Sequence, residues 1–300
     1  MISLENLPLE ILQLIFNKLD FESEINFRLL CKYFYYGLRI YDLYNIDNKY
    51  LNKLDDCVLR KFQNIKYLKI INNKISNYGI KHLNLHTLKI RSNIITDEGI
   101  KHLNLHTLNI GCNKYITNEG IKHMNLHNLN ISLNNNITNE GIKHMDLHRL
   151  NLCLNDNITD EGIKHMNLRH LNISDNEIIT NYAIKQMNLY SLNICSNNNI
   201  TDEGIRHLNL NKLIISWNNK ITNNGIKHMN LYELDFLGND NITNEGIKHL
   251  NLNTLNIGFN KHITIEGIMN MNLHTLDITS NDKITKNMVK HMNIKNLFCF

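Results

Sequence analysis

The sequence is poor in proline and has no long apolar run. Its 300 residues include one proline, and no stretch of 18 apolar residues is present that could span a bilayer. The first residues, Met1 to Leu9, lack both the basic flank and the apolar run of a secretory signal peptide. We therefore expect neither a membrane span nor secretion, and we expect an intracellular protein of the cytoplasm or nucleus.

Charge and cysteine spacing also exclude several classes of function. The net charge is only +4 with lysine and glutamate interleaved, so the chain lacks the basic stripe that a nucleic-acid backbone requires, and nucleic acid is not an expected partner. The cysteines form no Cys-x-x-Cys pair and keep no framework spacing, which predicts reduced, partly buried thiols. They are Cys31, Cys57, Cys112, Cys153, Cys195 and Cys299.

The chain is instead rich in asparagine and strongly repetitive. It contains 55 asparagines, and the fragment Gly-Ile-Lys-His and its variants recur at steps of 20 and then 21 residues. This is the leucine-rich-repeat pattern. It predicts an α/β fold, a curved solenoid of about 11 units of 20–21 residues with a parallel sheet on its concave face. The recurring glycine stands at positions 79, 99, 120, 141, 162, 204, 225, 246 and 267.

One unit explains the apolar columns. Leu129 and Ile131 alternate with period two, which predicts a short strand whose inward side chains stack on those of neighbouring units. Thr138 is placed to cap a short helix, in which Ile142 and Met145 face the same core. The recurring glycine indicates that neighbouring coils approach too closely for a side chain at that position.

An asparagine column follows the strands, and we interpret it as a structural ladder in which a buried amide bonds backbone groups left unpaired by the turn. Its members are counted as Asn73, Asn93, Asn113, Asn134, Asn155, Asn176, Asn197, Asn218, Asn239, Asn260 and Asn281.

Histidine pairs four residues apart, such as His123 with His127 and His144 with His148, have the spacing of a zinc-binding helix. The second histidine of each pair already approaches the next strand, and no Glu or Cys completes a ligand set. We expect two stacked solvent-facing columns and no metal or cofactor.

Residues 1–44 do not share the repeat period and predict a separate helical module. The only proline, Pro8, suits a first helical turn, and Ile11, Ile15 and Leu19 form one apolar stripe. A second helix is expected from Glu22 to Tyr36. So short a module cannot bury all its apolar groups by itself and should dock on another surface.

This module resembles the F-box, by which substrate receptors attach to a Skp-type adaptor of a cullin-based ubiquitin ligase. The resemblance covers about Leu4 to Leu38 and rests on three segments, Leu7-Pro8-x-Glu10-Ile11, Ile15-Phe16-x-x-Leu19-Asp20 and Arg28-x-x-Cys31-Lys32-x-Phe34. Phe34 stands where the family usually has tryptophan, and Ile25 where it usually has leucine. An F-box before leucine-rich repeats is the architecture of the F-box and leucine-rich-repeat family.

The resemblance implies a non-catalytic substrate receptor of an SCF-type E3 ligase, whose partners are a Skp-type adaptor, through it a cullin, and an unknown target protein. The residues that would contact the adaptor, or form the small core behind that contact, are Leu7, Pro8, Ile11, Ile15, Phe16, Leu19, Ile25 and Phe34. Consistent with a receptor, the sequence contains no phosphate loop, Gly-x-Ser-x-Gly elbow or His-Glu-x-x-His. The alternative stays open that the helices only cap a leucine-rich-repeat binder or inhibitor with no connection to ubiquitin ligases.

Three segments are expected: the F-box-like module at 1–44, a packed joint and solenoid cap at 45–64, and the leucine-rich-repeat domain at 65–300. The carboxyl end carries apolar side chains on a strand without a polar cap, so we expect self-association or a partner there.

The Asn, Ile and Lys bias is typical of an AT-rich genome. For a viral chain, the adaptor and the cytoplasm would be the host's.

The target site is expected where the repeat pattern breaks on the strands. Most outward strand positions are small or Asn, and uniform columns cannot specify a partner. The breaks bring charge and apolar bulk to neighbouring strands, although random drift among repeats would also produce them. They are Arg149, His170, Lys212, Ile214, Glu233, Asp235 and Leu237. Trp217 lies just beyond, and we favour simple packing for its column, which it shares with Cys112, Leu133, Leu154 and Phe259.

Overall fold

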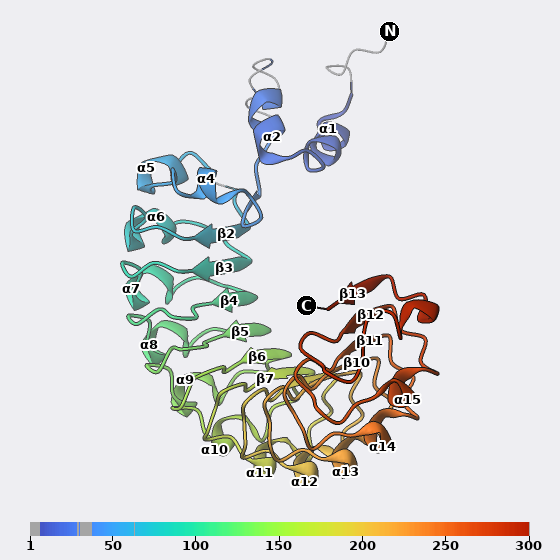
Figure 1. Cartoon of the computed structure of the whole chain (residues 1–300). Helices are drawn as coiled ribbons and strands as arrows, with labels where there is room; N and C mark the ends of the chain where they lie inside the picture. Colours follow the sequence, from blue (N-terminus) through green and yellow to red (C-terminus); the bar gives the residue numbers. More distant parts are fainter. Residues whose placement is uncertain (1–6, 29, 31–37, 63, 300) are drawn as a thin grey trace. The chain divides into compact units, whose positions relative to one another are not determined.

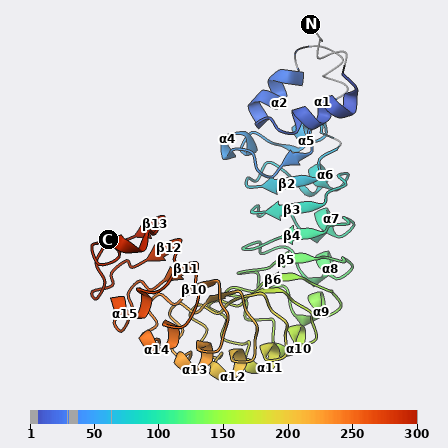
Figure 2. The same ribbon diagram turned by 90° about the vertical axis from the view of Figure 1, so that its right-hand side faces the viewer.

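The computed structural model describes residues 7–28, 30, 38–62 and 64–299. The chain divides into two compact units, unit 1 (Met1–Leu126) and unit 2 (His127–Phe300). In both units, short parallel strands stack on one side of the coils and one-turn helices stack on the other (Figures 1 and 2). The prediction of amino-terminal helices followed by a leucine-rich-repeat solenoid is confirmed.

Unit 1 begins with two eight-residue helices and then enters the repeats. Its elements are α1 (Leu9–Phe16), α2 (Phe21–Arg28), β1 (Asp42–Leu43), α4 (Asn48–Leu51), α5 (Asp56–Leu59), β2 (Tyr67–Ile70), α6 (Asn77–Ile80), β3 (Thr87–Ile90), α7 (Asp97–Ile100), β4 (Thr107–Asn109) and α8 (Asn118–Ile121). The strands pair in parallel in the order β1-β2-β3-β4. The sheet therefore already includes residues 42–43, and the expected boundaries at 44/45 and 64/65 stay predictions.

Unit 2 consists of repeats alone. Its strands are β5 (Asn128–Asn130), β6 (Arg149–Asn151), β7 (His170–Asn172), β8 (Ser191–Asn193), β9 (Lys212–Ile214), β10 (Glu233–Asp235), β11 (Thr254–Asn256), β12 (Thr275–Asp277) and β13 (Asn296–Phe298). The helices between them are α9 (Asn139–Ile142), α10 (Asp160–Ile163), α11 (Asn181–Ile184), α12 (Asp202–Ile205), α13 (Asn223–Ile226), α14 (Asn244–Ile247), α15 (Ile265–Ile268) and the 3₁₀ helix η2 (Lys290–Met292). Each strand pairs in parallel with the next, β5 through β13.

The core of each coil is formed by the columns that the sequence predicted. In the coil that contains α10, Leu150 and Leu152 point inward from the strand side, and Ile158 and Ile163 meet them from the helix side. All four are buried. Because a four-residue helix has little stability by itself, this packing is what holds each helix in place.

The asparagine ladder exists, but its members in the first two repeats were predicted one position too late. Asn155 shows the pattern: its Nδ2 donates to the Asn134 carbonyl of the preceding coil at 2.7 Å, and its Oδ1 accepts from the backbone N–H of Asn157 and Ile158. Asn73 and Asn93, by contrast, are exposed.

Asn72 and Ser92 hold the equivalent places. Asn72 donates to the Leu51 carbonyl at 2.7 Å, and Ser92 is buried. From the third repeat on, the turn contains one more residue, which adopts a left-handed backbone conformation. A non-glycine residue there costs about 1–2 kcal/mol. The φ angles are 67° at Cys112, 56° at Leu133, 54° at Leu154, 51° at Asp175, 56° at Ser196, 56° at Trp217, 68° at Gly238, 56° at Phe259 and 53° at Ser280.

A second ladder on the helix side explains the recurring glycine. Asp202 accepts the backbone N–H of Thr222 at 2.8 Å and its hydroxyl at 2.6 Å. A Cβ added at Gly225 would lie 2.3 Å from Asp202 Oδ1, so the predicted close approach is confirmed there. Ala183 occupies the same column in one coil beside Asp160, which keeps its bonds to Thr180.

The chemistry of this ladder decides whether threonine caps its helix. Where the preceding coil supplies Asp, the Thr222 hydroxyl donates to it and can still accept from the Asn224 N–H. Where the preceding coil supplies Asn, as at Asn139, the amide donates to Thr159, and Thr159 makes no cap bond. The expected threonine cap therefore forms only in some coils.

Candidate functional site

The first candidate surface is the outer face of α1. Leu12 and Phe16, four residues apart, are fully buried. On the opposite side Ile11, Leu14 and Ile15 are 44%, 63% and 41% exposed. Helices that are apolar all round are typically buried on every side, so the exposed apolar side of α1 is suited to contact with a different surface. We call Ile11, Leu14 and Ile15 the α1 outer face.

Side chains from both helices fix this face relative to the rest of unit 1. Gln13 on α1 donates its amide to the Arg39 carbonyl at 2.9 Å and accepts the Arg39 N–H at 2.8 Å. The Phe16 and Phe27 rings lie 6.3 Å apart between the two helices. Asp20 caps α2, because Oδ1 accepts the Ser23 N–H and Oδ2 accepts its hydroxyl. These two bonds lower the pKa of Asp20.

The predicted adaptor residues differ in their exposure. Ile11 and Ile15 belong to the α1 outer face, whereas Phe16 lies in the core behind it. The predicted apolar stripe of Ile11, Ile15 and Leu19 is exposed or half-buried, and the buried pair of the helix is Leu12 with Phe16. Leu14 was not among the predicted adaptor residues, although its spacing of three from Ile11 places both on one side of a helix. The remaining predicted residues are Leu7, Leu19 and Ile25, which are half-buried, Pro8, which is exposed, and Phe34, which lies outside the described residues.

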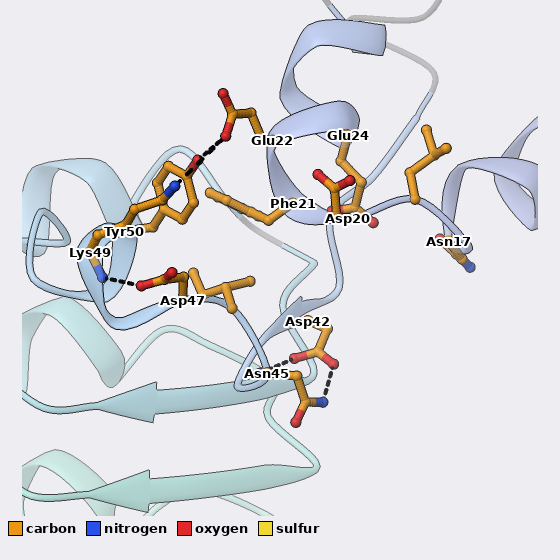
Figure 3. Close-up of a pocket in the computed structure, with 12 residues that line it drawn as sticks. Asn17, Asp20, Phe21, Glu22, Glu24, Asp42, Asn45, Asp47, Lys49 and Tyr50 are labelled. Atoms are coloured by element: carbon orange, nitrogen blue, oxygen red, sulfur yellow. Dashed lines mark hydrogen bonds and ion pairs between the residues drawn. The ribbon is translucent and has the colours of Figure 1, made fainter.

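A cavity of about 380 Å³ lies between α2 and the segment of β1 and α4 (Figure 3). The Tyr50 hydroxyl donates to Glu22 at 2.5 Å, and the Phe21 and Tyr50 rings lie 5.1 Å apart. Burial and the nearby carboxylates of Asp42 and Asp20 raise the pKa of Glu24 to about 7. The charged side chains that line this cavity are therefore mostly acidic: Asp20, Glu22, Glu24, Asp42 and Asp47 against one basic side chain, Lys49.

The predicted target residues fall into two groups on the sheet face of unit 2. Arg149 and His170 are register partners on β6 and β7. Burial, together with the positive charges of Arg149, His148 and Arg169, lowers the pKa of His170. Strand β8 separates this pair from the second group.

The second group lies on β9 and β10. Lys212 and Glu233 form an ion pair of 2.6 Å, and Ile214 is the register partner of Asp235. Together with parts of β11, these four side chains line a cavity of about 100 Å³. Leu237, just after β10, is half-buried.

Trp217 does more than pack into its own coil. Its ring is 48% exposed and lies 5.9 Å from the ring of Phe259, two coils further along. A Cβ added at Gly238 would lie 2.4 Å from the indole. The sequence placed Trp217 and Phe259 in one repeat column, but it did not predict a contact between two residues that are 42 positions apart.

The histidine columns separate into two arrangements. His165 Nε2 bonds the Lys143 carbonyl of the preceding coil at 2.7 Å, whereas His127 and His148 stack with ring centroids 4.7 Å apart. Histidines four residues apart thus direct their rings to different neighbours. Among the residues described, no group of three or more His, Cys, Asp or Glu side chains could hold a metal ion.

The helices and the cysteines can also be compared with what the sequence predicted. No described helix is both long and apolar enough to cross a membrane. The cysteines within the described part of the chain are free, and Cys57 and Cys112 are exposed rather than partly buried.

Comparison with known proteins gives matches along most of the chain. Residues 4–44 match the F-box domain family. The leucine-rich-repeat family matches residues 81–103, 101–124, 122–145, 143–166, 164–181, 206–229 and 270–287. No curated protein shows significant similarity to the sequence. A chain from the crystal structure of the yeast Rad7 and Elc1 complex has a similar fold, with a TM-score of 0.54, 17% sequence identity and coverage of 96% of both chains.

Proposed function

We propose that this chain, an F-box domain followed by leucine-rich repeats, is a substrate receptor of an SCF-type ubiquitin ligase. F-box and leucine-rich-repeat domains are typically non-catalytic binding modules. In this proposal α1 and α2 bind a Skp-type adaptor, and through it a cullin, while the repeats bind a target protein. The catalytic contribution is proximity, because holding a target lysine near activated ubiquitin raises its effective concentration. The cell compartment would be the cytoplasm or nucleus.

The α1 outer face is the observation that carries the proposal. Ile11, Leu14 and Ile15 form an apolar strip on a helix whose other side is already packed. Helix-in-groove recognition uses such anchors at spacings of three and four. The similar solved structure contains a second protein, Elc1, so an elongin-C-type protein belongs among the adaptors to be tested.

The test is a pull-down of purified Skp-type and elongin-C-type adaptors by the full chain. A variant with Ile11→Ala, Leu14→Ala and Ile15→Ala should lose at least 2 kcal/mol of binding free energy, about a thirtyfold weaker Kd, because a few buried anchors supply most of the affinity of an interface. Leu133→Ala, which truncates a half-exposed leucine in the repeats, is the matched control and should bind normally. Equal adaptor affinity in the triple variant and the control would contradict the proposal.

A second candidate is a leucine-rich-repeat binder in which the helices serve as a cap. Its support is that Glu22 and Phe21 of α2 both contact Tyr50 beside the first coils, as a cap would. Terminal repeats need such a cover. This candidate predicts no adaptor binding by the unaltered chain.

The target surface is proposed on the sheet face of unit 2, at the residues where the repeat pattern breaks. The Lys212–Glu233 pair and Ile214 beside Asp235 give this face charge and bulk that the Asn-lined strands lack.

Self-association at the carboxyl end stays a prediction. Phe298 on β13 is half-exposed. Sedimentation by analytical ultracentrifugation at several protein concentrations would test whether the chain self-associates.

A further inference from the structure

An exposed aromatic pair interrupts the left-handed turn column of unit 2. Trp217 follows β9, Phe259 follows β11, and their rings are 5.9 Å apart at an interplanar angle of 47°. They are 48% and 46% exposed. Large apolar side chains with rings in contact but half in solvent are a recurrent feature of protein-binding surfaces.

Gly238 makes this pair possible. It is the glycine of a column in which other coils carry Leu, Asp or Ser. A Cβ there would come within 2.4 Å of Trp217 Cε3 and Cζ3, so glycine leaves room for the indole to lie across the intervening coil and reach Phe259. The general need of the turn does not explain this glycine, because neighbouring coils form the same turn with larger residues.

Leu237 extends the apolar surface toward the sheet face. Its Cδ1 lies 3.4 Å from the position of a Cβ added at Gly258. Leu237 directly precedes Gly238, and Gly258 directly precedes Phe259. Trp217 and Leu237 therefore each lean over a glycine of the following coil. We call Trp217, Leu237 and Phe259 the aromatic patch.

The strands beside the patch carry the acidic groups of Asp235 and Asp277. Asp235 accepts from Asn256 Nδ2 at 3.1 Å and from the Leu237 N–H at 3.2 Å, and the Ser216 hydroxyl also donates to it. Asn256 pairs with both Asp235 and Asp277, which places the two carboxylates two strands apart on one face. Within the described part of the chain, no ion pair involves either of them.

Lys212, on the strand next to that of Asp235, does not cancel this charge because it is paired with Glu233. The negative charge of Asp235 also acts on Cys195, just after β8. Burial raises the pKa of Cys195, and the carboxylates of Asp175 and Asp235 contribute to the increase. The sheet face next to the aromatic patch is thus negatively charged.

We propose that the aromatic patch and the carboxylates of Asp235 and Asp277 bind an extended segment of a partner protein that carries an apolar side chain and a nearby Lys or Arg. The apolar side chain packs against Trp217 and Phe259, and the cation lies over the acidic strands. Electrostatic complementarity selects a basic segment over an acidic one. The inference rests on the proposed function only in taking this partner to be the ligase target, because the binding itself needs no adaptor.

The chain contains a single tryptophan, so the intrinsic fluorescence of Trp217 reports on this site directly. The probes are ten-residue peptides of three kinds: one with leucine and two arginines, one with both arginines replaced by glutamate, and one with the leucine replaced by serine. Each kind is made with one, two, three and four residues between the leucine and the first of the two charged positions, because the spacing is unknown. At least one leucine–arginine peptide should shift and saturate the fluorescence, and its glutamate and serine counterparts should bind at least tenfold more weakly.

Variants then locate the contact, with affinity measured by anisotropy of a labelled leucine–arginine peptide. Phe259→Ala and Gly238→Ala should each weaken binding about tenfold, the second because the new methyl group displaces the indole. Asp235→Asn keeps the acceptor oxygen for Ser216 and should weaken binding severalfold. Leu133→Ala, in the same turn column of another coil, is the control and should bind normally.

The outcomes separate this inference from the proposed function. If no leucine–arginine peptide perturbs Trp217, or the glutamate peptides bind as well, the inference is wrong even when the adaptor binds. If the peptides bind as expected while no adaptor is captured, the ligase assignment fails and the inference stands.

Discussion

The α1 helix and the repeat coils differ in how far their apolar side chains are buried. In the coil that contains α10, the isoleucines and leucines of the strand and helix columns are buried, and apart from Leu154 at the turn the exposed positions carry charged or polar side chains. In α1 only Leu12 and Phe16 are buried, while Ile11, Leu14 and Ile15 face outward. The repeats are therefore stabilised by contacts within the chain, whereas much of the apolar surface of α1 is available to another molecule. Truncating an apolar residue should cost stability in the coils and binding in the helix.

The largest effect is expected in the interior of the repeats. Ile163 is fully buried on α10, and Ile163→Ala should lower the free energy of unfolding by about 2–5 kcal/mol, since it removes packed atoms and leaves a cavity. Urea unfolding followed by circular dichroism measures this. Ile163→Val is the matched control, with a cost of about 0.5–1.5 kcal/mol. An alanine variant as stable as the valine variant would show that the coil collapses around the gap.

Within α1 the same substitution should give two different results. Leu12→Ala removes a fully buried side chain and should destabilise the helical module by about 2–5 kcal/mol. Leu14→Ala changes an exposed position of the same helix and should stay within about 0.5 kcal/mol of the unaltered protein. Hydrogen exchange of the α1 amides distinguishes the two variants. Similar losses of protection in both would mean that the α1 outer face is covered within the chain.

The asparagine ladder should be sensitive in one place and insensitive in another. Asn197 is fully buried and its Oδ1 accepts the Asn199 and Ile200 N–H groups. Asn197→Ala leaves buried polar groups unpaired, which should cost about 1–3 kcal/mol. Asn93→Ala alters an exposed side chain and should be nearly neutral. Thermal unfolding of both variants measures the difference. A large loss of stability in Asn93→Ala would mean that Asn93 is a member of the ladder, as the sequence predicted.

These comparisons show which features a sequence can predict. The apolar columns were predictable because strand and helix periods require a particular residue type at each inward position. The ladder positions at Asn72 and Ser92 were not, because the first two turns are one residue shorter and the repeat was aligned on the following asparagine. Both are found once the number of residues between strand and helix is compared from coil to coil.

The candidate sites were predictable to a smaller degree. The F-box resemblance located the amino-terminal module, but the stripe chosen on α1 ran through Ile11 and Ile15 and left out Leu14. The contact between Trp217 and Phe259 depends on a glycine in the coil between them and on a left-handed turn. No local pattern in the sequence encodes a contact of this kind.

The smallest effect concerns pH at the joint between α2 and the first coils. Burial and the Asp42 and Asp20 carboxylates raise the pKa of Glu24 from 4.5 to about 7, against a weaker opposing effect of Arg28. The folded state then holds this proton more tightly than the unfolded state, so the free energy of unfolding falls as pH rises from about 4.5 to about 7 and changes little above that. Because Glu24 is partly solvated, we expect a fall of about 1 kcal/mol or less.

The measurement is the urea midpoint at pH 5 and pH 7.5, together with the ¹³C chemical shift of the Glu24 carboxyl group across that range. Glu24→Gln should remove the difference between the two midpoints that Glu24 causes, and it should make the protein more stable than the unaltered chain at pH 7.5. Asp42→Asn removes a neighbouring negative charge and should move the Glu24 titration to lower pH, since a nearby carboxylate disfavours the charged form. A Glu24 midpoint near 4.5 in the unaltered chain would mean that water and counterions reach this carboxylate freely, and that the acidic lining of the joint has no influence on how α2 is held.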